Sequence, residues 1–260
     1  MKVHFSKYHG TGNDFILLDS RKNVIPELTS GQIARLCDRH FGIGADGLIL
    51  LGESESYDFK MVYYNSDGKE GTMCGNGGRC AVSFAQSGGW IGEQCSFEAS
   101  DGIHHAKIHP NEIVELSMNN VHHIEDTPHG IFMDTGSPHL VKFVDGLDTF
   151  DVFSEGKKLR YHSDFPEGCN VNFVEVGSAS IYVRTYERGV ENETLSCGTG
   201  VTASALAAAL SYQDRRSPLQ VKTIGGMLSV QFQKDQKAAH FSNIILSGPT
   251  EFVFQGSITL

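Results

Sequence analysis

Two cysteines occur in the same short phrase, Cys74-Gly75-Asn76-Gly77 and Cys197-Gly198-Thr199-Gly200. Each phrase precedes a run of small and apolar residues that predicts a helix, so each cysteine is expected where a helix begins. A thiol ionises readily there, because the first N–H groups of a helix have no helical partner and the helix dipole is positive. We therefore expect Cys74 and Cys197 to be a reactive pair.

Two such thiols suit the removal of an amino acid α-proton and its return on the opposite face, because base and acid exchange roles in the reverse reaction. Two thiolates about 7 Å apart would repel by roughly 2–3 kcal/mol at an effective dielectric constant near 20. One thiol therefore stays protonated when the other ionises, and the pair titrates as a unit. Backbone N–H groups at the two helix starts could hold the α-carboxylate as the carbanion forms, so this scheme needs no cofactor.

The spacing around the two phrases indicates an internal duplication. Asn13 precedes Cys74 by 61 residues, and Ser137 precedes Cys197 by 60. Two further pairings keep nearly constant offsets: 46–50 with 170–174, and the strand-like runs 59–64 with 181–186. We infer two halves of similar topology that present one cysteine each to a shared cleft.

The pattern along the chain is one of strands alternating with a few helices. Thr29-Ser30-Gly31 starts a capped helix that Phe41-Gly42 stops. Strands are expected at 62–65, 114–118, 131–134, 181–186, 227–232 and 244–247, and a helix buried on all sides at 203–210. The domain junction is placed in the polar stretch 119–130. The last apolar segment, 251–260, has no counterpart recognised at the end of the first half, and it could return as a strand of the first domain.

Composition limits the classes of function. The chain has 260 residues, 40% hydrophobic content and a formal net charge of −10, so two modest domains are expected and no basic surface for nucleic acid. No apolar stretch is long enough to span a bilayer, and the first residues lack a signal-peptide core. Six dispersed cysteines do not resemble a secreted disulfide framework. A cytoplasmic enzyme with no membrane partner is expected.

Several motifs together resemble the diaminopimelate epimerase family, and the resemblance covers essentially the whole chain. They are His9-Gly10-Thr11-Gly12-Asn13-Asp14-Phe15, Gly42-Ile43-Gly44-Ala45-Asp46-Gly47, Tyr64-Asn65-Ser66-Asp67-Gly68, Met73-Cys74-Gly75-Asn76-Gly77, Tyr186-Glu187-Arg188-Gly189 and Ser196-Cys197-Gly198-Thr199-Gly200. The resemblance implies a pyridoxal-independent enzyme that interconverts LL- and meso-diaminopimelate on the route to lysine and peptidoglycan. It implies an α/β (α+β-type) fold of two pseudo-symmetric domains, 1–118 joined by 251–260 and 119–250. Each would be a mixed sheet wrapped around a central helix, with the active site in the cleft between them.

The resemblance also implies roles for individual residues. Cys74 and Cys197 would be the acid/base pair. Gly75, Asn76, Gly198 and Thr199 would hold the reacting carboxylate, and Asn13, Asn65, Asn170, Glu187 and Arg188 would hold the substrate, chiefly its distal end. A guanidinium can bind the distal carboxylate with two hydrogen bonds, while carboxylate and amide oxygens accept from the distal ammonium. No cofactor is implied, and a homodimer is compatible with the resemblance.

Two positions depart from the family pattern. Ser137-Pro138-His139 stands where many members have Asn before Pro-His, which leaves Ser137 and His139 as possible substrate contacts only. Gly47 stands where some members have Gln, which removes one possible substrate contact. Neither position carries the proton-transfer chemistry.

Other features favour plain structural interpretations. Cys37, Cys80, Cys95 and Cys169 are expected to be small buried apolar residues. The sequence 42–47 matches a dinucleotide-binding pattern, but a helix is predicted before it and a strand after it, the reverse of what that motif requires. The histidines, notably His104-His105 with His109 and His122-His123 with His129, lack the spacing of a zinc site, so no metal is expected.

Two rival functions remain open. A proline or hydroxyproline racemase would use the same two-cysteine chemistry, although Asn76 stands where we expect His in that relative. A non-catalytic binding protein for a small zwitterion could use the same cleft, although binding alone requires neither cysteine.

Overall fold

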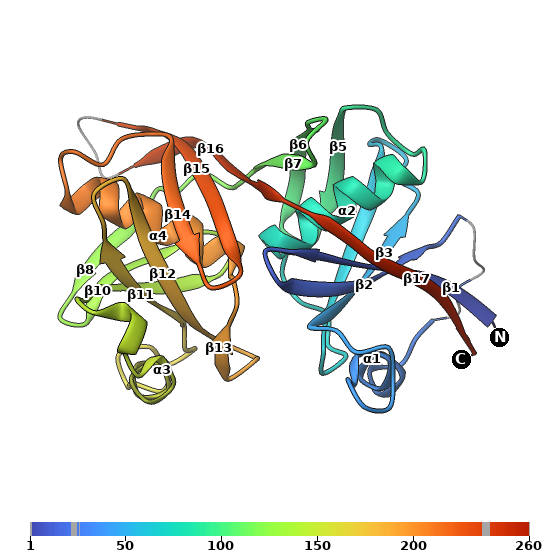
Figure 1. Ribbon diagram of the computed structural model, residues 1–260, viewed down its shortest axis with the longest axis horizontal. Helices are drawn as coiled ribbons and strands as arrows, with labels where there is room; N and C mark the ends of the chain where they lie inside the picture. Colours follow the sequence, from blue (N-terminus) through green and yellow to red (C-terminus); the bar gives the residue numbers. More distant parts are fainter. Residues whose placement is uncertain (1, 22–24, 26, 236–239, 260) are drawn as a thin grey trace. The chain divides into compact units, whose positions relative to one another are not determined.

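The computed structural model describes residues 2–21, 25, 27–235 and 240–259. The chain forms two compact units, Met1–Leu116 with Gly248–Leu260, and Ser117–Ser247. Leu260, the last residue of the predicted C-terminal segment, lies outside the described residues. Each unit is a mixed sheet with its own central helix (Figure 1).

In the described part of the first unit there are eight strands and two helices. These are β1 (Lys2–Gly10), β2 (Asn13–Asp19), α1 (Ser30–Cys37), β3 (Gly47–Gly52), β4 (Phe59–Asn65), α2 (Gly75–Ser87), β5 (Gln94–Ala99), β6 (Gly102–Ile108), β7 (Ile113–Ser117) and β17 (Glu251–Thr259). The β1–β2, β3–β4, β5–β6 and β6–β7 pairs are antiparallel, and the β2–β3 and β4–β5 pairs are parallel. Strand β17 pairs antiparallel with β1.

The second unit repeats this order. Its elements are β8 (Ile124–Thr127), β9 (Gly130–Asp134), β10 (Pro138–Phe143), the 3-10 turn η1 (Leu147–Thr149), α3 (Val152–Arg160), β11 (Asn170–Val176), β12 (Ser180–Glu187), β13 (Asn192–Thr194), α4 (Gly198–Ser211), β14 (Leu219–Thr223), β15 (Gly226–Lys234) and β16 (Phe241–Pro249). Along β9, β10, β11, β12, β14, β15 and β16 the successive pairs run antiparallel, parallel, antiparallel, parallel, antiparallel and antiparallel. This is the order of β1 to β7, so the predicted fold of two pseudo-symmetric domains is confirmed.

The central helices α2 and α4 are made of small residues because strands surround them. Helix α2 packs against β1, β2, β3, β4 and β6, and α4 packs against β9, β10, β11, β12, β14 and β15. The residues from Gly198 to Ala209 are all buried, which confirms the helix predicted to be covered on all sides. A side chain at Gly78 would meet Met73 Cε at 2.7 Å and Leu116 Cδ2 at 2.9 Å, so only glycine lets α2 lie this close to its sheet.

Strand β8 lies within the stretch predicted as a domain junction. It follows β7 and pairs antiparallel with β9, just as β17 follows β16 and pairs with β1. The C-terminal strand therefore has a counterpart that the sequence analysis did not recognise. Residues 124–127 have only intermediate or high exposure and carry two acidic side chains, so they lack the apolar alternation that identifies a strand.

The other local predictions agree with the structure. Helix α1 begins after Thr29, whose side chain forms a capping box with Gln32. All six expected strands are present: five lie within longer strands, and the one expected at 114–118 is β7, which ends at Ser117. Helix α1 precedes the 42–47 pattern and strand β3 follows it, which confirms that this is not a dinucleotide-binding motif. No helix among the described residues is long and apolar enough to cross a membrane.

Candidate active site

Cys74 and Cys197 each occupy the N-cap position of a central helix. Cys74 precedes α2 with φ −102° and ψ 121°, and Cys197 precedes α4 with φ −122° and ψ 113°. Helical hydrogen bonding begins with Gly78 N–H to Cys74 O at 2.7 Å and Val201 N–H to Cys197 O at 2.8 Å. The N–H groups of the intervening residues lie ahead of the first helical bond, where an anion is stabilised. Cys74 is partly exposed and Cys197 is buried.

The Cys74 side chain contacts a row of amide groups. Its Sγ lies 3.7 Å from Asn13 Oδ1, which also accepts a hydrogen bond from Asn76 Nδ2 at 3.2 Å. Asn13 Nδ2 donates to Asp46 Oδ2 at 2.8 Å, which fixes the orientation of the Asn13 amide. The structure thus brings together Cys74, Asn13, Gly75 and Asn76, four of the five residues predicted in this half.

A tight turn places Asn13 beside the helix start. Thr11 and Gly12 join β1 to β2 with φ values of 51° and 84°, and Gly10 pairs with Asn13 across the hairpin. Positive φ at both central residues is the geometry of a two-residue hairpin whose twist matches that of its strands. Asn13 is consequently the first residue of a strand packed against α2.

An ion cluster supports this turn from behind. Asp14 pairs with Lys7 Nζ at 2.7 Å and with Arg39 Nη2 at 2.8 Å, and Arg39 also binds Asp46 Oδ1 at 2.7 Å. Burial raises the pKa of Asp14, but hydrogen bonds from Arg39 and Lys7 outweigh it and hold this pKa at about 2. Asp14 is therefore ionised at neutral pH. The sequence analysis did not identify this ion cluster.

Asn65 lies at the end of β4, directly opposite Gly47 on β3. A Cβ at Gly47 would lie 2.5 Å from Tyr63 Cε2, and a Cβ at Gly71 would lie 2.9 Å from both the Tyr63 ring and Asn65 Nδ2. The Tyr63 ring therefore occupies the space that a side chain at position 47 would need. The Asn65 side chain lies against Gly71.

The Cys197 side chain contacts a hydrogen-bonded chain of side chains. Its Sγ lies 3.5 Å from Thr199 Oγ1, which lies 2.8 Å from His139 Nε2. Asn172 Nδ2 donates to His139 Nδ1 at 3.0 Å, and Thr185 Oγ1 donates to Asn172 Oδ1 at 2.9 Å. This arrangement makes Nδ1 of His139 an acceptor and places its proton on Nε2, facing Thr199. The Thr199 hydroxyl hydrogen is then available to Cys197 Sγ.

His139 is a neutral imidazole at physiological pH. The ring is fully buried, and this burial lowers the pKa of His139 to about 3. Helix α4 approaches it closely because position 200 is glycine: a Cβ there would lie 2.3 Å from Asn172 Oδ1 and 3.3 Å from His139 Cε1. His139 therefore acts here as a hydrogen-bond donor rather than as a cation.

Ser137 and Asn170 complete the group around Thr199. Ser137 Oγ lies 3.1 Å from His139 Nε2 and 3.4 Å from Thr199 Oγ1, and Asn170 Nδ2 donates to Ser137 Oγ at 3.0 Å. Ser137 therefore occupies the place in the second unit that Asn13 has in the first: each side chain contacts the residue two positions after a cysteine. The shorter serine keeps this contact because Asn170 reaches it.

Glu187 and Arg188 end strand β12 next to this group. The backbone N–H of Arg188 donates to Asn170 Oδ1 at 2.8 Å, and Arg188 Nη1 donates to Glu167 O at 3.4 Å. Thr194 Oγ1 donates to Glu187 Oε2 at 2.9 Å. The backbone of Arg188 is therefore connected, through Asn170, to the side chains around Thr199. The Glu187 carboxylate has a partner on the neighbouring strand β13.

The remaining cysteines are structural. Cys37, Cys80, Cys95 and Cys169 are buried, which confirms the prediction. Burial raises the pKa of Cys37 and Cys95 to about 12 and that of Cys169 to about 11, and it raises that of Cys80 further. These thiols are protonated at neutral pH.

The histidine pairs named above do not form a metal site among the described residues. His104 pairs with Asp101 at 2.9 Å and His109 with Glu115 at 3.0 Å. His129 instead meets His162 and Asp164, the one group of three potential metal ligands within the described ranges. It lies apart in sequence from the cysteine phrases, and His129 Nε2 lies 3.0 Å from Asp164 Oδ2.

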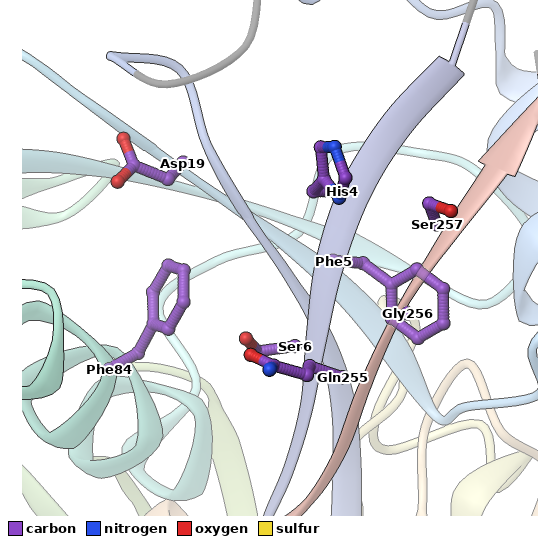
Figure 2. Close-up of a pocket in the computed structure, with 8 residues that line it drawn as sticks. All are labelled: His4, Phe5, Ser6, Asp19, Phe84, Gln255, Gly256 and Ser257. Atoms are coloured by element: carbon purple, nitrogen blue, oxygen red, sulfur yellow. The ribbon is translucent and has the colours of Figure 1, made fainter.

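A separate cavity of about 530 Å³ lies along β1 and β17 in the first unit. Figure 2 shows the Phe5 ring over Gly256 among its lining side chains, which also include Phe84 and Asp19. None of the predicted site residues lines it. This cavity is therefore not part of the candidate site.

Among the residues that contact the site residues and were missed in the sequence, three stand out. Asp46 and Asn172 orient Asn13 and His139, and Arg79 contacts Asn76 from within α2. Asp46 and Asn172 stand in the paired segments 46–50 and 170–174, so the duplication offered a signal. Arg79 has no counterpart of its type in the second half, where Thr202 stands at the same distance from the cysteine.

Comparisons with known proteins agree on one family. The model of the family described as diaminopimelate epimerase matches residues 5–124 and 131–253. A diaminopimelate epimerase of Flavobacterium psychrophilum is 50% identical over 260 residues, spanning 99% of this chain and 100% of the relative. Another, of Chlorobaculum tepidum, is 43% identical over 264 residues, spanning 96% of this chain and 99% of the relative.

Solved structures of more distant proteins share the fold. A phenazine biosynthesis protein of the PhzF family from Bacillus anthracis has a TM-score of 0.80 at 15% identity and covers 100% of both chains. A probable proline racemase from Agrobacterium radiobacter K84 has a TM-score of 0.74 at 15% identity, covering 99% of this chain and 93% of that one. Identity this low establishes the fold alone, whereas the family match and the 50% identity extend along the whole sequence. The chain therefore belongs to the diaminopimelate epimerase family.

Proposed function

We propose that this protein interconverts LL- and meso-diaminopimelate by moving the α-proton between two cysteines, in lysine and peptidoglycan precursor synthesis. The observation that carries the proposal is the pair of N-cap cysteines, Cys74 and Cys197, at equivalent places in two repeated units. Membership of the diaminopimelate epimerase family, with relatives of that name at 50% and 43% identity, supports this substrate.

In the proposed mechanism one thiolate removes the α-proton and the other cysteine, as thiol, delivers a proton to the opposite face. The electron pair left on the α-carbon takes up that proton, and the negative charge passes from one sulfur to the other. The next turnover in the reverse direction uses the cysteines in exchanged roles. The two thiols share one negative charge and titrate as a pair.

The start of each helix would stabilise the carbanion through the α-carboxylate. Gly75, Asn76, Gly198 and Thr199 supply backbone N–H groups ahead of the first helical hydrogen bond. Charge that develops on the carboxylate is stabilised there by preoriented donors. The proposal includes no cofactor and no metal.

The distal amino-acid end would be held by the polar residues around the cysteines. We propose Asn13, Asn65, Asn170, Glu187 and Arg188 for this role, with Ser137 and His139 as further candidates. Ser137, His139 and Asn170 share one hydrogen-bonded group with Thr199, which supports a common task. His139, being neutral, would contribute a hydrogen bond rather than a charge.

The proposal also covers the domain organisation, the cellular location and the oligomeric state. We infer two epimerase halves, 1–118 with 251–260 and 119–250, in a cytoplasmic protein that acts on a small molecule. A homodimer is proposed with them, supported by exposed Phe252, Val253 and Phe254 on β17. Sedimentation velocity of the purified protein tests the dimer, and a single monomeric species at micromolar concentration would contradict it.

The first experiment is proton NMR of the reduced protein with LL-diaminopimelate in D₂O, without pyridoxal phosphate or metal. Loss of the α-proton signal together with conversion to the meso form is the expected result. Exchange with proline or hydroxyproline instead would assign the racemase reaction. Binding of diaminopimelate without any exchange would favour a non-catalytic binding protein.

Replacement of either cysteine tests the two-base mechanism. Cys74→Ala and Cys197→Ala should each lose at least about a hundredfold in kcat, because general acid/base transfer contributes 10²–10⁴-fold. Cys95→Ala, at a buried thiol in β5, is the matched control and should keep its turnover. Circular dichroism checks that each variant is folded, and substantial turnover by a folded Cys74→Ala or Cys197→Ala would refute the mechanism.

A further inference from the structure

Arg79 is a fully buried arginine in the second turn of α2. Its exposed fraction is 0%, and no acidic side chain among the described residues forms an ion pair with it. A buried guanidinium normally has a carboxylate partner, because removing an isolated charge from water is unfavourable. The absence of such a partner suggests that the charge serves something else nearby.

The Arg79 side chain is directed at the start of its own helix. Helical side chains point towards the N-terminus, so a long side chain in the second turn covers the first. Arg79 Nη2 donates to Asn76 Oδ1 at 2.9 Å, and Nη1 donates to Gly75 O at 3.3 Å. Nε has no hydrogen-bond partner within the described part of the chain. The guanidinium therefore lies against the two residues that follow Cys74.

The hydrogen bond to Asn76 continues to the thiol. With its Oδ1 held by Arg79, Asn76 turns its Nδ2 towards Asn13 Oδ1, the oxygen that also faces Cys74 Sγ. Arg79 thus determines which end of the Asn76 amide meets Asn13. Asn13 Oδ1 can accept a hydrogen bond from the Cys74 thiol, whereas the guanidinium charge stabilises the thiolate, and each turnover uses both forms.

The guanidinium keeps its charge at working pH. Burial lowers the pKa of Arg79 to about 10, which still leaves it protonated at neutral pH. Because Arg79 is buried, its charge acts on Cys74 with less screening than an exposed cation would.

The end of strand β1 leaves room for the guanidinium. A Cβ at Gly10 would lie 3.1 Å from Arg79 Nη2 and 3.2 Å from Asn76 O. Glycine therefore lets β1 lie directly against the arginine.

At the equivalent position, the second unit has a neutral residue instead of a cation. Thr202 stands five residues after Cys197, as Arg79 does after Cys74, and its Oγ1 donates to Gly198 O at 3.0 Å. This is the same bond back to the residue after the cysteine, made by a neutral side chain. Cys197 instead contacts Thr199, which contacts a neutral His139. The duplication therefore preserves the hydrogen bond and differs in charge.

We propose that Arg79 is a positioning residue that stabilises the Cys74 thiolate with its buried charge and orients Asn76, while Cys197 relies on neutral hydrogen bonds. The inference rests on the proposed two-cysteine function and adds to it an electrostatic difference between the two thiols.

The test measures how alkylation of Cys74 by iodoacetamide depends on pH, in a Cys197→Ala background that removes coupling between the thiols. Peptide mass spectrometry separates Cys74 from the buried cysteines. Arg79→Met removes the charge at similar length, and Arg79→Lys keeps it. Thr202→Val, the equivalent change in the second unit, is the matched control because it removes a hydrogen bond of the same kind without a charge.

Other ionisable groups around the start of α2 do not account for a difference in the Cys74 alkylation midpoint between variants. Asp14, Asp46, Lys7 and Arg39 form one cluster in which the pKa of Asp14 is about 2. Tyr8 on β1 and Cys80 on α2 have raised pKa values because both are buried. His9 on β1 faces Glu251, His104 on β6 faces Asp101, and Asp19 on β2 faces Arg21; all are the same in every variant.

Arg79→Met should raise the midpoint of Cys74 alkylation by about one pH unit or more, which is about a tenfold slower reaction at neutral pH. Arg79→Lys should keep the midpoint close to that of the Arg79 protein, and Thr202→Val should leave it unchanged. With both cysteines present, Arg79→Met should lower kcat in both directions, with rescue by Arg79→Lys. An unchanged midpoint in folded Arg79→Met would overturn the proposal.

The Cys74 midpoint without the Arg79 change, and its comparison with α-proton exchange, give two further tests. If Arg79→Met does not fold, the Cys197→Ala protein decides by itself: a Cys74 midpoint at or above the ordinary thiol value of about 8.5 would refute a stabilised thiolate. Alkylation requires no substrate, so it also separates the two proposals. An Arg79-dependent midpoint without α-proton exchange would reject the proposed function alone, and exchange with an Arg79-independent midpoint would reject this inference alone.

Discussion

His139 shows how a single buried side chain is specified by its neighbours. Both ring nitrogens are used, because Asn172 donates to Nδ1 and Thr199 lies at Nε2. Protonation would require Nδ1 to give up its acceptor role in a buried site, and this burial holds the pKa of His139 at about 3. The residue is therefore suited to orient Thr199 and Cys197 over the whole physiological pH range.

The low pKa of His139 makes the free energy of unfolding depend on pH. Between about pH 6.5 and 3 the unfolded chain binds a proton at this histidine and the folded chain does not, so the free energy of unfolding falls as pH falls. His139→Gln should make that fall less steep in urea titrations at pH 7 to 4. His123→Gln, at an exposed histidine, is the control and should keep the native slope. Equal slopes for His139→Gln and the native protein would contradict this account.

Gly47 is required by packing rather than by backbone conformation. Gly47→Ala would place a methyl group 2.5 Å from Tyr63 Cε2 and 2.7 Å from Tyr64 O, and the backbone oxygen cannot move aside. We expect a loss of about 1–3 kcal/mol in the free energy of unfolding, as for other overpacked sites. Gly52→Ala, on the same strand, meets only Ser20 Oγ at 3.5 Å and should change stability little. Denaturant midpoints measure both, and equal effects would rule out the steric explanation.

At the level of elements, local sequence signals and tertiary contacts contribute differently to each helix. Helix α1 carries its own start signal, since Thr29 Oγ1 accepts from Gln32 N–H at 3.3 Å and Gln32 Oε1 accepts from Thr29 N–H at 2.9 Å. Helices α2 and α4 have no side-chain cap at their cysteines. Their starts are left for other groups, which is what a site for an anionic substrate requires.

The capping box of α1 gives a prediction on stability. Thr29→Ala removes the side-chain acceptor for Gln32 N–H and should lower the free energy of unfolding by about 1 kcal/mol. Ser30→Ala, at an exposed first helical position, is the control and should stay near the native value. Thermal and chemical denaturation measure the difference. A neutral Thr29→Ala would show that packing of Ile33 and Leu36 alone holds this helix.

At the level of the whole molecule, each half of the sequence is followed by a strand that pairs with the first strand of the other half. Strand β17 pairs with β1 in the first unit, and β8 pairs with β9 in the second. Both units therefore have an added strand at the equivalent position. Such strands cover the edge of a sheet that would otherwise expose unpaired backbone groups. Phe252 and Phe254 also contact Tyr8 and Phe5 of β1, with ring centroids 5.4 and 5.9 Å apart.

Removal of residues 251–260 should therefore weaken the first unit selectively. Backbone amides of β1 and β2 should lose protection in hydrogen exchange, because β1 becomes an edge strand. Amides of β10 and β11 in the second unit should keep theirs, since their pairing involves no part of β17. Uniform loss of protection in both units would instead show that the protein unfolds as one cooperative body.

The sequence by itself determined the repeated plan of the fold and placed Cys74 and Cys197 where helices begin. Cysteines before glycine-rich helix starts, constant offsets between motifs and apolar periodicity are local signals that survive without tertiary information. They sufficed to predict α1, six strands, both central helices and the two-domain fold. They did not identify β8, whose exposed acidic residues carry no strand pattern.

Tertiary structure alone decided how the site is supported. Ser137 keeps a contact with Thr199 because Asn170 reaches it from a neighbouring strand, and Arg79 is buried because Gly10 leaves space on another. Hydrogen bonds and desolvation of this kind depend on distances between residues far apart in the chain, which composition and spacing do not encode. The pKa of His139 follows from the same cause, since it depends on burial that exists only once the second unit has folded.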